Sequence, residues 1–175
     1  MKFTPLALRG AFAVEVEHHL DERGAFARTF CRDEFEARGL VADIAQCSLS
    51  FNTRKGTLRG MHFQKAPHEE AKLVRCTRGS VYDVIVDLRP ESETFRSWAG
   101  VVLGAEQGNA IYIPKGFAHG FLTLEDESEV FYQLSEIYSP SSAAGVRWND
   151  PAFGIVWPGD VAVISERDNM YADFR

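Results

Sequence analysis

The stretch GNAIYIPKGFAHGFLTL, residues 108–124, carries the strongest indication of the fold. Its two short apolar runs, NAIYI and GFLTL, are separated by a segment that begins with the turn-forming residues PKG. VYDVIVDL, residues 81–88, is another such run, rich in β-branched residues. Further runs of this kind are SWAGVVL (97–103), EVFYQLSEIY (129–138) and GVRW (145–148). Many short strands separated by turn residues predict an all-β domain, an antiparallel sandwich or barrel.

The chain is long enough for one domain with its own core. It has 175 residues, and a hydrophobic content of 45% argues against disorder. Because no repeat, low-complexity segment or linker interrupts it, we expect residues 1–175 to form a single domain. The best helix candidate runs from Arg32 to Arg38 and ends at Gly39. The polar segment 158–175 is either a tail or a flap over a site.

Charge and cysteine content restrict the partners and the compartment. Nineteen Lys and Arg against 25 Asp and Glu give a net charge of −6, which disfavours nucleic acid. A local cluster of basic residues suits either a small anionic ligand or a salt-bridged surface; it includes Arg54, Lys55, Arg59, Lys72, Arg75 and Arg78. Three scattered cysteines without a C-x-x-C pair indicate free thiols in the cytoplasm. No apolar run is long enough to span a membrane, and no signal peptide is evident.

The same stretch matches a motif of the metal-binding cupins, G-x5-P-x-G-x2-H. The matching residues are Gly108, Pro114, Gly116 and His119. The first cupin motif begins with Gly56 and His62, but Gln64 stands where its second histidine is expected. The partial match predicts a cupin-type double-stranded β-helix, or jelly roll, with one or two short helices.

The first cupin motif also bears on metal binding. At most His62, Glu69 and His119 could hold a metal, with the Gln64 amide in the fourth place. Glutamine is a poor ligand beside imidazole, so we expect no resident metal. A histidine without a metal is available for proton transfer near neutral pH.

Seven motifs in order resemble the dTDP-4-dehydrorhamnose 3,5-epimerase family. They are DERG (21–24), LRGMHFQ (58–64), KLVRC (72–76), DVIVDLR (83–89), IPKGFAHGF (113–121), YSPSS (138–142) and RWNDPAFGIVWP (147–158). The resemblance implies a metal-free, cofactor-independent homodimer that acts on a nucleotide-diphosphate-linked 4-keto-6-deoxyhexose in deoxysugar, such as L-rhamnose, biosynthesis. The C4 ketone acidifies the C–H bonds at C3 and C5, so a base and an opposed acid can invert both carbons through an enolate.

The resemblance also implies the catalytic residues. His62 matches the base and Tyr132 the acid, while Lys72 would stabilise the enolate oxygen. Asp168, in SERD (165–168), matches the carboxylate partner of the base. Each has a structural alternative: a packed core histidine, a core tyrosine, a solvent-facing lysine and a turn cap.

Further residues match substrate contacts of the family. Arg59 corresponds to a diphosphate ligand, and His119 is expected near the sugar or the diphosphate. Tyr138 would pack against the ligand; six residues after Tyr132, it would share a strand face with it. Arg23 corresponds to a nucleotide contact supplied by the neighbouring subunit.

Arg59 and His62 are separated by three positions, an odd number, so a regular strand would point their side chains to opposite faces. Gly60 lies between them and could host a β-bulge that re-aims one side chain. We therefore expect an irregular strand at this position.

Three positions depart from the family pattern where it meets the nucleotide. Arg28 replaces a glutamate, Ser48 an asparagine and His19 an aromatic residue. Gln46, Ser48 and Ser50 still alternate onto one face. We expect the type of reaction to be the same as in the family. The nucleotide base, or the deoxygenation pattern of the sugar, is where this protein could differ from the family. Cytidine- and guanosine-linked sugars are the alternatives.

Other functions remain compatible with the sequence. A mono-epimerase acting at C3 or C5 alone would use the same residues. A metal-dependent cupin isomerase or oxygenase is a second alternative, and a catalytically silent sugar-nucleotide-binding protein is a third. The acid and base pair argues against the third, because binding alone needs neither group.

Overall fold

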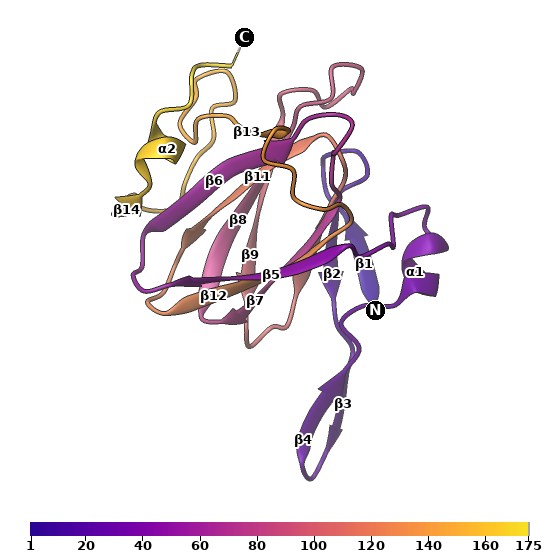
Figure 1. The fold of residues 1–175 in the computed structure, drawn as a ribbon. Helices are drawn as coiled ribbons and strands as arrows, with labels where there is room; N and C mark the ends of the chain where they lie inside the picture. The colour runs from indigo at the N-terminus through magenta and orange to yellow at the C-terminus, as the bar shows by residue number, and fades with distance from the viewer. Residues whose placement is uncertain (175) are drawn as a thin grey trace.

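Two six-stranded arrays of β-structure face each other in the computed structural model, which describes residues 1–174 (Figure 1). The first sheet has the order β1 (Lys2–Pro5), β2 (Phe12–Glu15), β10 (Ala110–Ile113), β7 (Lys72–Arg78), β12 (Ser128–Leu134) and β5 (Gln46–Asn52). The second has the order β13 (Ala143–Gly145), β6 (Thr57–Gln64), β11 (Phe117–Thr123), β8 (Ser80–Asp87) and β9 (Trp98–Gly104), and β14 (Val163–Ile164) pairs with β6. Only the β14–β6 pair is parallel among the described strands. The predicted all-β, antiparallel fold is confirmed.

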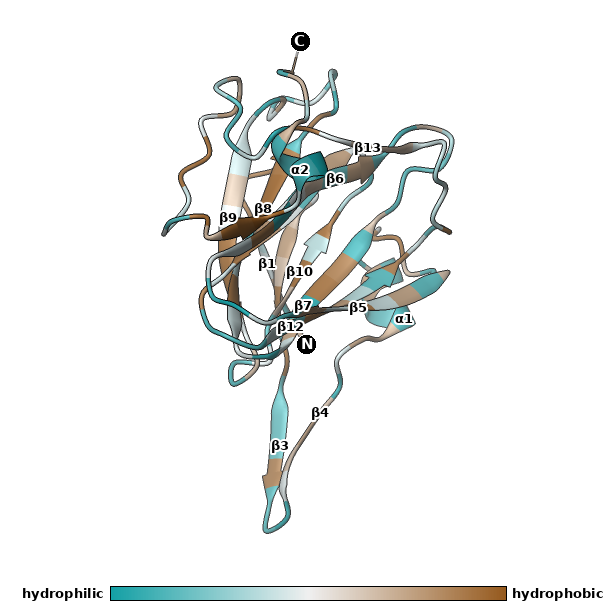
Figure 2. Cartoon of the chain, turned by 60° about the vertical axis from the view of Figure 1, so that its left-hand side comes forward, coloured by the Kyte–Doolittle hydropathy of each residue, from teal (hydrophilic) through white to brown (hydrophobic). Residues whose placement is uncertain are grey.

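The main core lies between the two sheets. Apolar side chains from β7, β10 and β12 meet those from β8, β9 and β11, and Val74, Ile85 and Ile111 are fully buried there. Residues on these strands alternate between the shared interior and the outer faces, as the two-residue period of a strand requires. Figure 2 shows the apolar residues concentrated on the strands of the sheets.

A short helix covers the outer face of the first sheet. Helix α1 (Arg32–Glu36) is two residues shorter than the predicted Arg32–Arg38, because the chain tightens after Glu36 and turns at Gly39 with φ +69°. Its Phe35 is buried and packs edge-on against Tyr112 of β10, with ring centroids 5.8 Å apart. The helix therefore extends the core outward.

The C-terminal segment covers the outer face of the second sheet. Phe153, Trp157 and Phe174 pack onto buried residues of β6 and β8. Helix α2 (Glu166–Asn169) follows β14 and lies over β6 (Figure 1). Of the two alternatives for the C-terminal segment, a tail or a flap over a site, the structure shows the flap for residues 158–174.

A hairpin, β3 (His18–Asp21) and β4 (Gly24–Ala27), projects away from both sheets (Figures 1 and 2). Its residues Leu20 and Phe26 are 79% and 72% exposed. Neither α1 nor α2 is long and apolar enough to cross a membrane, and residues 1–174 contain no helix that is.

A buried carboxylate organises the connection after β8. Asp87 accepts hydrogen bonds from the Arg89 guanidinium at 2.7 and 2.9 Å, and from the hydroxyls of Ser92 and Thr94 at 2.6 and 2.7 Å. Burial alone raises the pKa of Asp87, but these bonds outweigh it and lower the pKa from 3.8 to about 2. Ionised Asp87 therefore stabilises the loop that leads to β9.

Asp87→Asn should lower the free energy of unfolding by about 2 kcal/mol at pH 7, since a depression of nearly two pKa units is worth that much. Because the folded-state pKa is depressed, this stabilisation is complete above the unfolded pKa near 4 and is lost as the pH falls through about 2. Urea unfolding of Asp87→Asn and of the parent protein, repeated between pH 7 and pH 3, measures the difference in their free energy of unfolding.

Glu91→Gln, which removes an exposed carboxylate from the same loop, serves as the control. A constant difference between Asp87→Asn and the parent protein across this pH range would contradict the ionic origin of the effect.

Candidate active site

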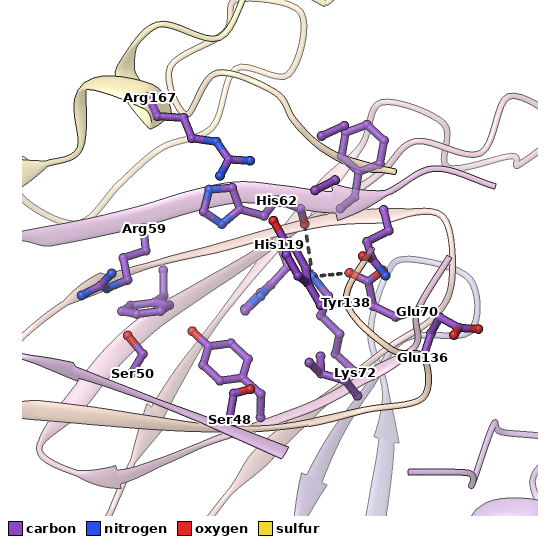
Figure 3. Close-up of a pocket in the computed structure, with 17 residues that line it drawn as sticks. Ser48, Ser50, Arg59, His62, Glu70, Lys72, His119, Glu136, Tyr138 and Arg167 are labelled. Atoms are coloured by element: carbon purple, nitrogen blue, oxygen red, sulfur yellow. Dashed lines mark hydrogen bonds and ion pairs between the residues drawn. The ribbon is translucent and has the colours of Figure 1, made fainter. Parts of the chain in front are cut away.

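A cavity of about 340 Å³ opens between the two sheets (Figure 3). Strands β5, β7 and β12 of the first sheet form one wall, and β6 and β11 of the second form the other. The loop after β12 and helix α2 complete its rim. A space of this size accommodates a hexose and part of a larger ligand.

The bulge predicted in β6 is present and sets the geometry of the cavity. The register shifts by one residue between the pairs His62–His119 and Arg59–Phe121. Gly60 has φ +137°, and a Cβ there would lie 2.5 Å from the Cα of the glycine that follows His119. As a result, Arg59 and His62 line the same cavity, although they are an odd number of positions apart.

Asp168 meets His62 from behind the cavity wall. Its Oδ1 lies 2.8 Å from Nε2 of His62, and its Oδ2 accepts the backbone N–H of Gly60 at 3.1 Å. Ser165 caps helix α2 by accepting the backbone N–H of Asp168. Burial raises the pKa of Asp168, but the hydrogen bond and charge interaction with His62, with further bonds from Gly60 and Ser165, outweigh it, and the net pKa is lowered.

The pairing leaves Nδ1 of His62 free of the carboxylate. The His62 side chain is 43% exposed, whereas that of Asp168 is 7% exposed. An ionised carboxylate on one ring nitrogen stabilises the imidazolium that forms when the other nitrogen takes a proton. The pair can therefore act as a base.

Tyr132 enters the cavity from β12, in the sheet opposite β6. Burial raises the pKa of its hydroxyl, and the nearby Asp83 carboxylate raises it further. The hydroxyl thus keeps its proton at neutral pH and can donate it. A base and an acid on opposite walls suit removal of a proton from one face of a sugar and its return to the other.

A second buried histidine–carboxylate pair was not predicted. Nε2 of His119 lies 2.8 Å from Oδ2 of Asp83, and both side chains are almost completely buried. Burial raises the pKa of Asp83, and His119 opposes this shift. His119 also packs edge-on against Tyr132, with centroids 5.9 Å apart. The available signal was an aspartate in the middle of the apolar run VYDVIVDL.

Lys72 is almost completely buried at the start of β7. Its Nζ lies 3.1 Å from Oε1 of Glu70 and 3.2 Å from the backbone carbonyl of His62 (Figure 3). The structural alternative of a solvent-facing lysine is therefore wrong.

Two guanidinium groups border the cavity. Arg59 donates to the side-chain oxygen of Asn52 at 2.7 Å, which fixes its orientation. Arg167, on helix α2, lies above His62 in Figure 3 and also lines the cavity. Arg167 was missed because a charged residue beside Asp168 in a short polar segment carries no periodic signal.

Tyr138 reaches the cavity differently from the prediction. Strand β12 ends at Leu134, so Tyr138 lies on the following loop, and the shared strand face with Tyr132 is wrong. The backbone N–H of Tyr138 donates to the Gln46 side chain, which holds this loop against β5. Ser48 and Ser50 of β5 line the cavity as well.

The remaining predicted residues lie outside the cavity. Arg23 sits at the tip of the β3–β4 hairpin and pairs with Asp21. Arg28 and His19 border a shallow hollow at the base of that hairpin. Within one chain, these nucleotide-side positions do not meet the sugar-sized cavity.

The supposed metal position is organised differently. The Gln64 amide donates to the backbone carbonyls of His68 and Ile137 and accepts the backbone N–H of Ser139, so it joins two loops. Across residues 1–174, no three His, Cys, Asp or Glu side chains are grouped so that they could hold a metal ion.

Comparison with known proteins agrees with this geometry. The family model described as dTDP-4-dehydrorhamnose 3,5-epimerase matches residues 5–175. The dTDP-4-dehydrorhamnose 3,5-epimerase of Methanothermobacter thermautotrophicus is 42% identical over 177 residues, covering 99% of this chain and 95% of that protein.

Solved structures are similarly close. The enzyme of the same name from Elizabethkingia anophelis superposes with a TM-score of 0.96 at 37% identity, covering 99% of this chain and 96% of that one. The dTDP-6-deoxy-D-glucose-3,5-epimerase of Legionella pneumophila, solved with dTDP-4-keto-L-rhamnose, has a TM-score of 0.89 at 34% identity, covering 95% and 89%.

Two facing antiparallel sheets, with a carboxylate-paired histidine and a protonated tyrosine across one cavity, define a jelly-roll enzyme suited to proton transfer. The chain belongs to the dTDP-4-dehydrorhamnose 3,5-epimerase family. It is therefore an isomerase, and the predicted cupin-type jelly roll is confirmed.

Asp168→Asn should lower kcat by roughly 10²–10³-fold, because the amide no longer stabilises a positive charge on His62. The KM should change little, since Asp168 lies behind His62. Steady-state epimerisation kinetics, with thermal unfolding to verify the fold, measure both quantities.

Glu166→Gln removes a carboxylate from the same helix at an exposed position and should leave kcat unchanged. Equal activities of Asp168→Asn and Glu166→Gln would show that the pairing with His62 has no role in the reaction.

Proposed function

We propose that the protein inverts C3 and C5 of dTDP-4-dehydro-6-deoxyglucose without a cofactor. The observation that carries this proposal is the buried Asp168 behind His62, opposed across the cavity by Tyr132. Membership of the epimerase family supports the substrate class. Three groups are needed and three are present: a base, an opposed acid and a cation for the enolate oxygen.

The reaction follows from the ketone. Nδ1 of His62 removes the proton from the carbon next to C4, and the electron pair of the C–H bond forms the enolate. The Lys72 ammonium donates a hydrogen bond to the oxygen that gains negative charge. Tyr132 then gives its proton to the opposite face of the carbon, and proton exchange with solvent restores both residues. The second carbon is inverted after the sugar has shifted in the cavity.

Charge around the cavity supports a diphosphate-linked substrate. Arg59 is oriented by Asn52, and Arg167 of α2 lies near His62 at the rim (Figure 3). Guanidinium groups match pairs of phosphate oxygens. We expect Tyr138, which is 55% exposed on its loop, to pack against the ligand beside them. His119, held by Asp83, would border the sugar.

We infer that a second copy of the chain completes the nucleotide site. Arg23 and Arg28 lie on or beside a hairpin that leaves its own domain, and its apolar residues Leu20 and Phe26 are exposed. An extended arm with such residues suits insertion into a neighbouring subunit. The arm would bring Arg23 to the nucleotide, with Arg28 at the base of the arm. Gln46 and Ser48 of β5 would border the nucleotide from the subunit that receives the arm. The nucleotide base and the cytoplasmic location remain predictions from the sequence.

Incubation with dTDP-4-keto-6-deoxyglucose in D2O should incorporate deuterium at both C3 and C5, followed by NMR. His62→Ala should abolish the exchange at both carbons, because one base serves both. Label at a single carbon would instead establish a mono-epimerase. Absence of label, also with cytidine- and guanosine-linked analogues, would favour a binding protein.

Mixed dimers test the shared site. Arg23→Ala and His62→Ala should each be nearly inactive alone. In a mixed dimer, one cavity combines an intact His62 with the partner's intact Arg23. Random exchange in a 1:1 mixture should therefore restore about a quarter of the parental activity. No recovery after verified subunit exchange would contradict the shared site.

A further inference from the structure

We propose that Glu70 is a positioning residue that holds Lys72 in line with the developing enolate oxygen; this rests on the proposed function. An ammonium group has three N–H donors. The Lys72 ammonium donates one hydrogen bond to the backbone carbonyl of His62 at 3.2 Å, and it forms an ion pair with Oε1 of Glu70 at an N–O distance of 3.1 Å. These two contacts hold the ammonium at the cavity wall, and donor capacity remains for a ligand oxygen.

The backbone between the two residues is fixed. Ala71 donates its N–H to the Ser135 hydroxyl at 2.8 Å and accepts the Ser135 N–H at 3.0 Å. Ala71 itself packs into the cluster beneath α1. Because alternate residues of an extended chain point to opposite faces, Glu70 and Lys72 both face the cavity.

The carboxylate of Glu70 is bonded unlike the structural carboxylate of Asp87. Both oxygens of Asp87 accept hydrogen bonds from the loop that they stabilise. In Glu70, Oε1 contacts Lys72, while Oε2 is buried without a hydrogen-bond partner among the described residues. Few buried polar atoms in a native structure lack a partner, so the unpaired Oε2 of Glu70 calls for an explanation other than stability of the fold.

Burial makes the pair sensitive to the loss of either charge. The side chains of Lys72 and Glu70 are 8% and 9% exposed. Little water is available to replace a missing partner, so the ammonium would reorient toward other acceptors without Glu70. A misaligned Lys72 ammonium would bind the ketone of the substrate nearly as well as an aligned one. It would lose the hydrogen bond that strengthens as negative charge develops on the enolate oxygen.

The test is a double-mutant cycle on kcat with Glu70→Gln and Lys72→Met. Glu70→Gln, which keeps the size of the side chain, should lower kcat about tenfold with KM changed less than about twofold. In the Lys72→Met background, the same substitution should have no further effect on kcat, because the residue acts through Lys72.

Glu136→Gln is the matched control: Glu136 also lines the cavity, but it bonds to the backbone of Ile137. It should leave kcat within about twofold of the parent. The inference is overturned if Glu70→Gln matches Glu136→Gln, if it acts on KM alone, or if its full effect persists without Lys72. Deuterium exchange by the parent protein, measured alongside, separates these outcomes from failure of the proposed function itself.

Discussion

The close approach of β6 and β11 at Gly60 is the constraint on which the rest of the site depends. The two strands pack backbone against backbone there, and a side chain at Gly60 would collide with the facing strand. The resulting bulge changes the side-chain alternation of β6 by one residue. As a result, a cation for phosphate and a histidine for proton transfer share one cavity, while Met61 between them is buried on the opposite face of the sheet.

The same bulge exposes the backbone N–H of Gly60 to Asp168, which lies 108 residues further along the chain. The carboxylate therefore holds both the bulged backbone and the ring of His62. Packing of Phe153, Trp157 and Phe174 on the outer face of the second sheet brings this segment into place. Apolar burial thus positions a charge that local hydrogen bonds then orient.

The buried charges that line the cavity or lie directly behind its wall include three pairs. Asp168 faces His62, Asp83 faces His119 and Glu70 faces Lys72. Such pairs contribute little to stability compared with apolar side chains of similar size, because desolvation of each charge offsets their attraction. Three of them around one cavity are consistent with a chemical role. Burial, together with the Asp83 carboxylate of one pair, also raises the pKa of the Tyr132 hydroxyl.

Local patterns in the sequence were sufficient to predict the all-β class, most of the strands and the bulge at Gly60. Alternation of side chains along a strand, and the residues that form turns, depend on only a few neighbouring positions. The resemblance to the family led to His62, Lys72, Tyr132 and Asp168, all of which meet at or behind the cavity. The end of β12 before Tyr138, the Asp83–His119 pair and the positions of Glu70 and Arg167 required the tertiary structure. Those features depend on which strands face each other and how deeply a side chain is buried. Contacts between distant segments decide both, and no short stretch of sequence encodes them.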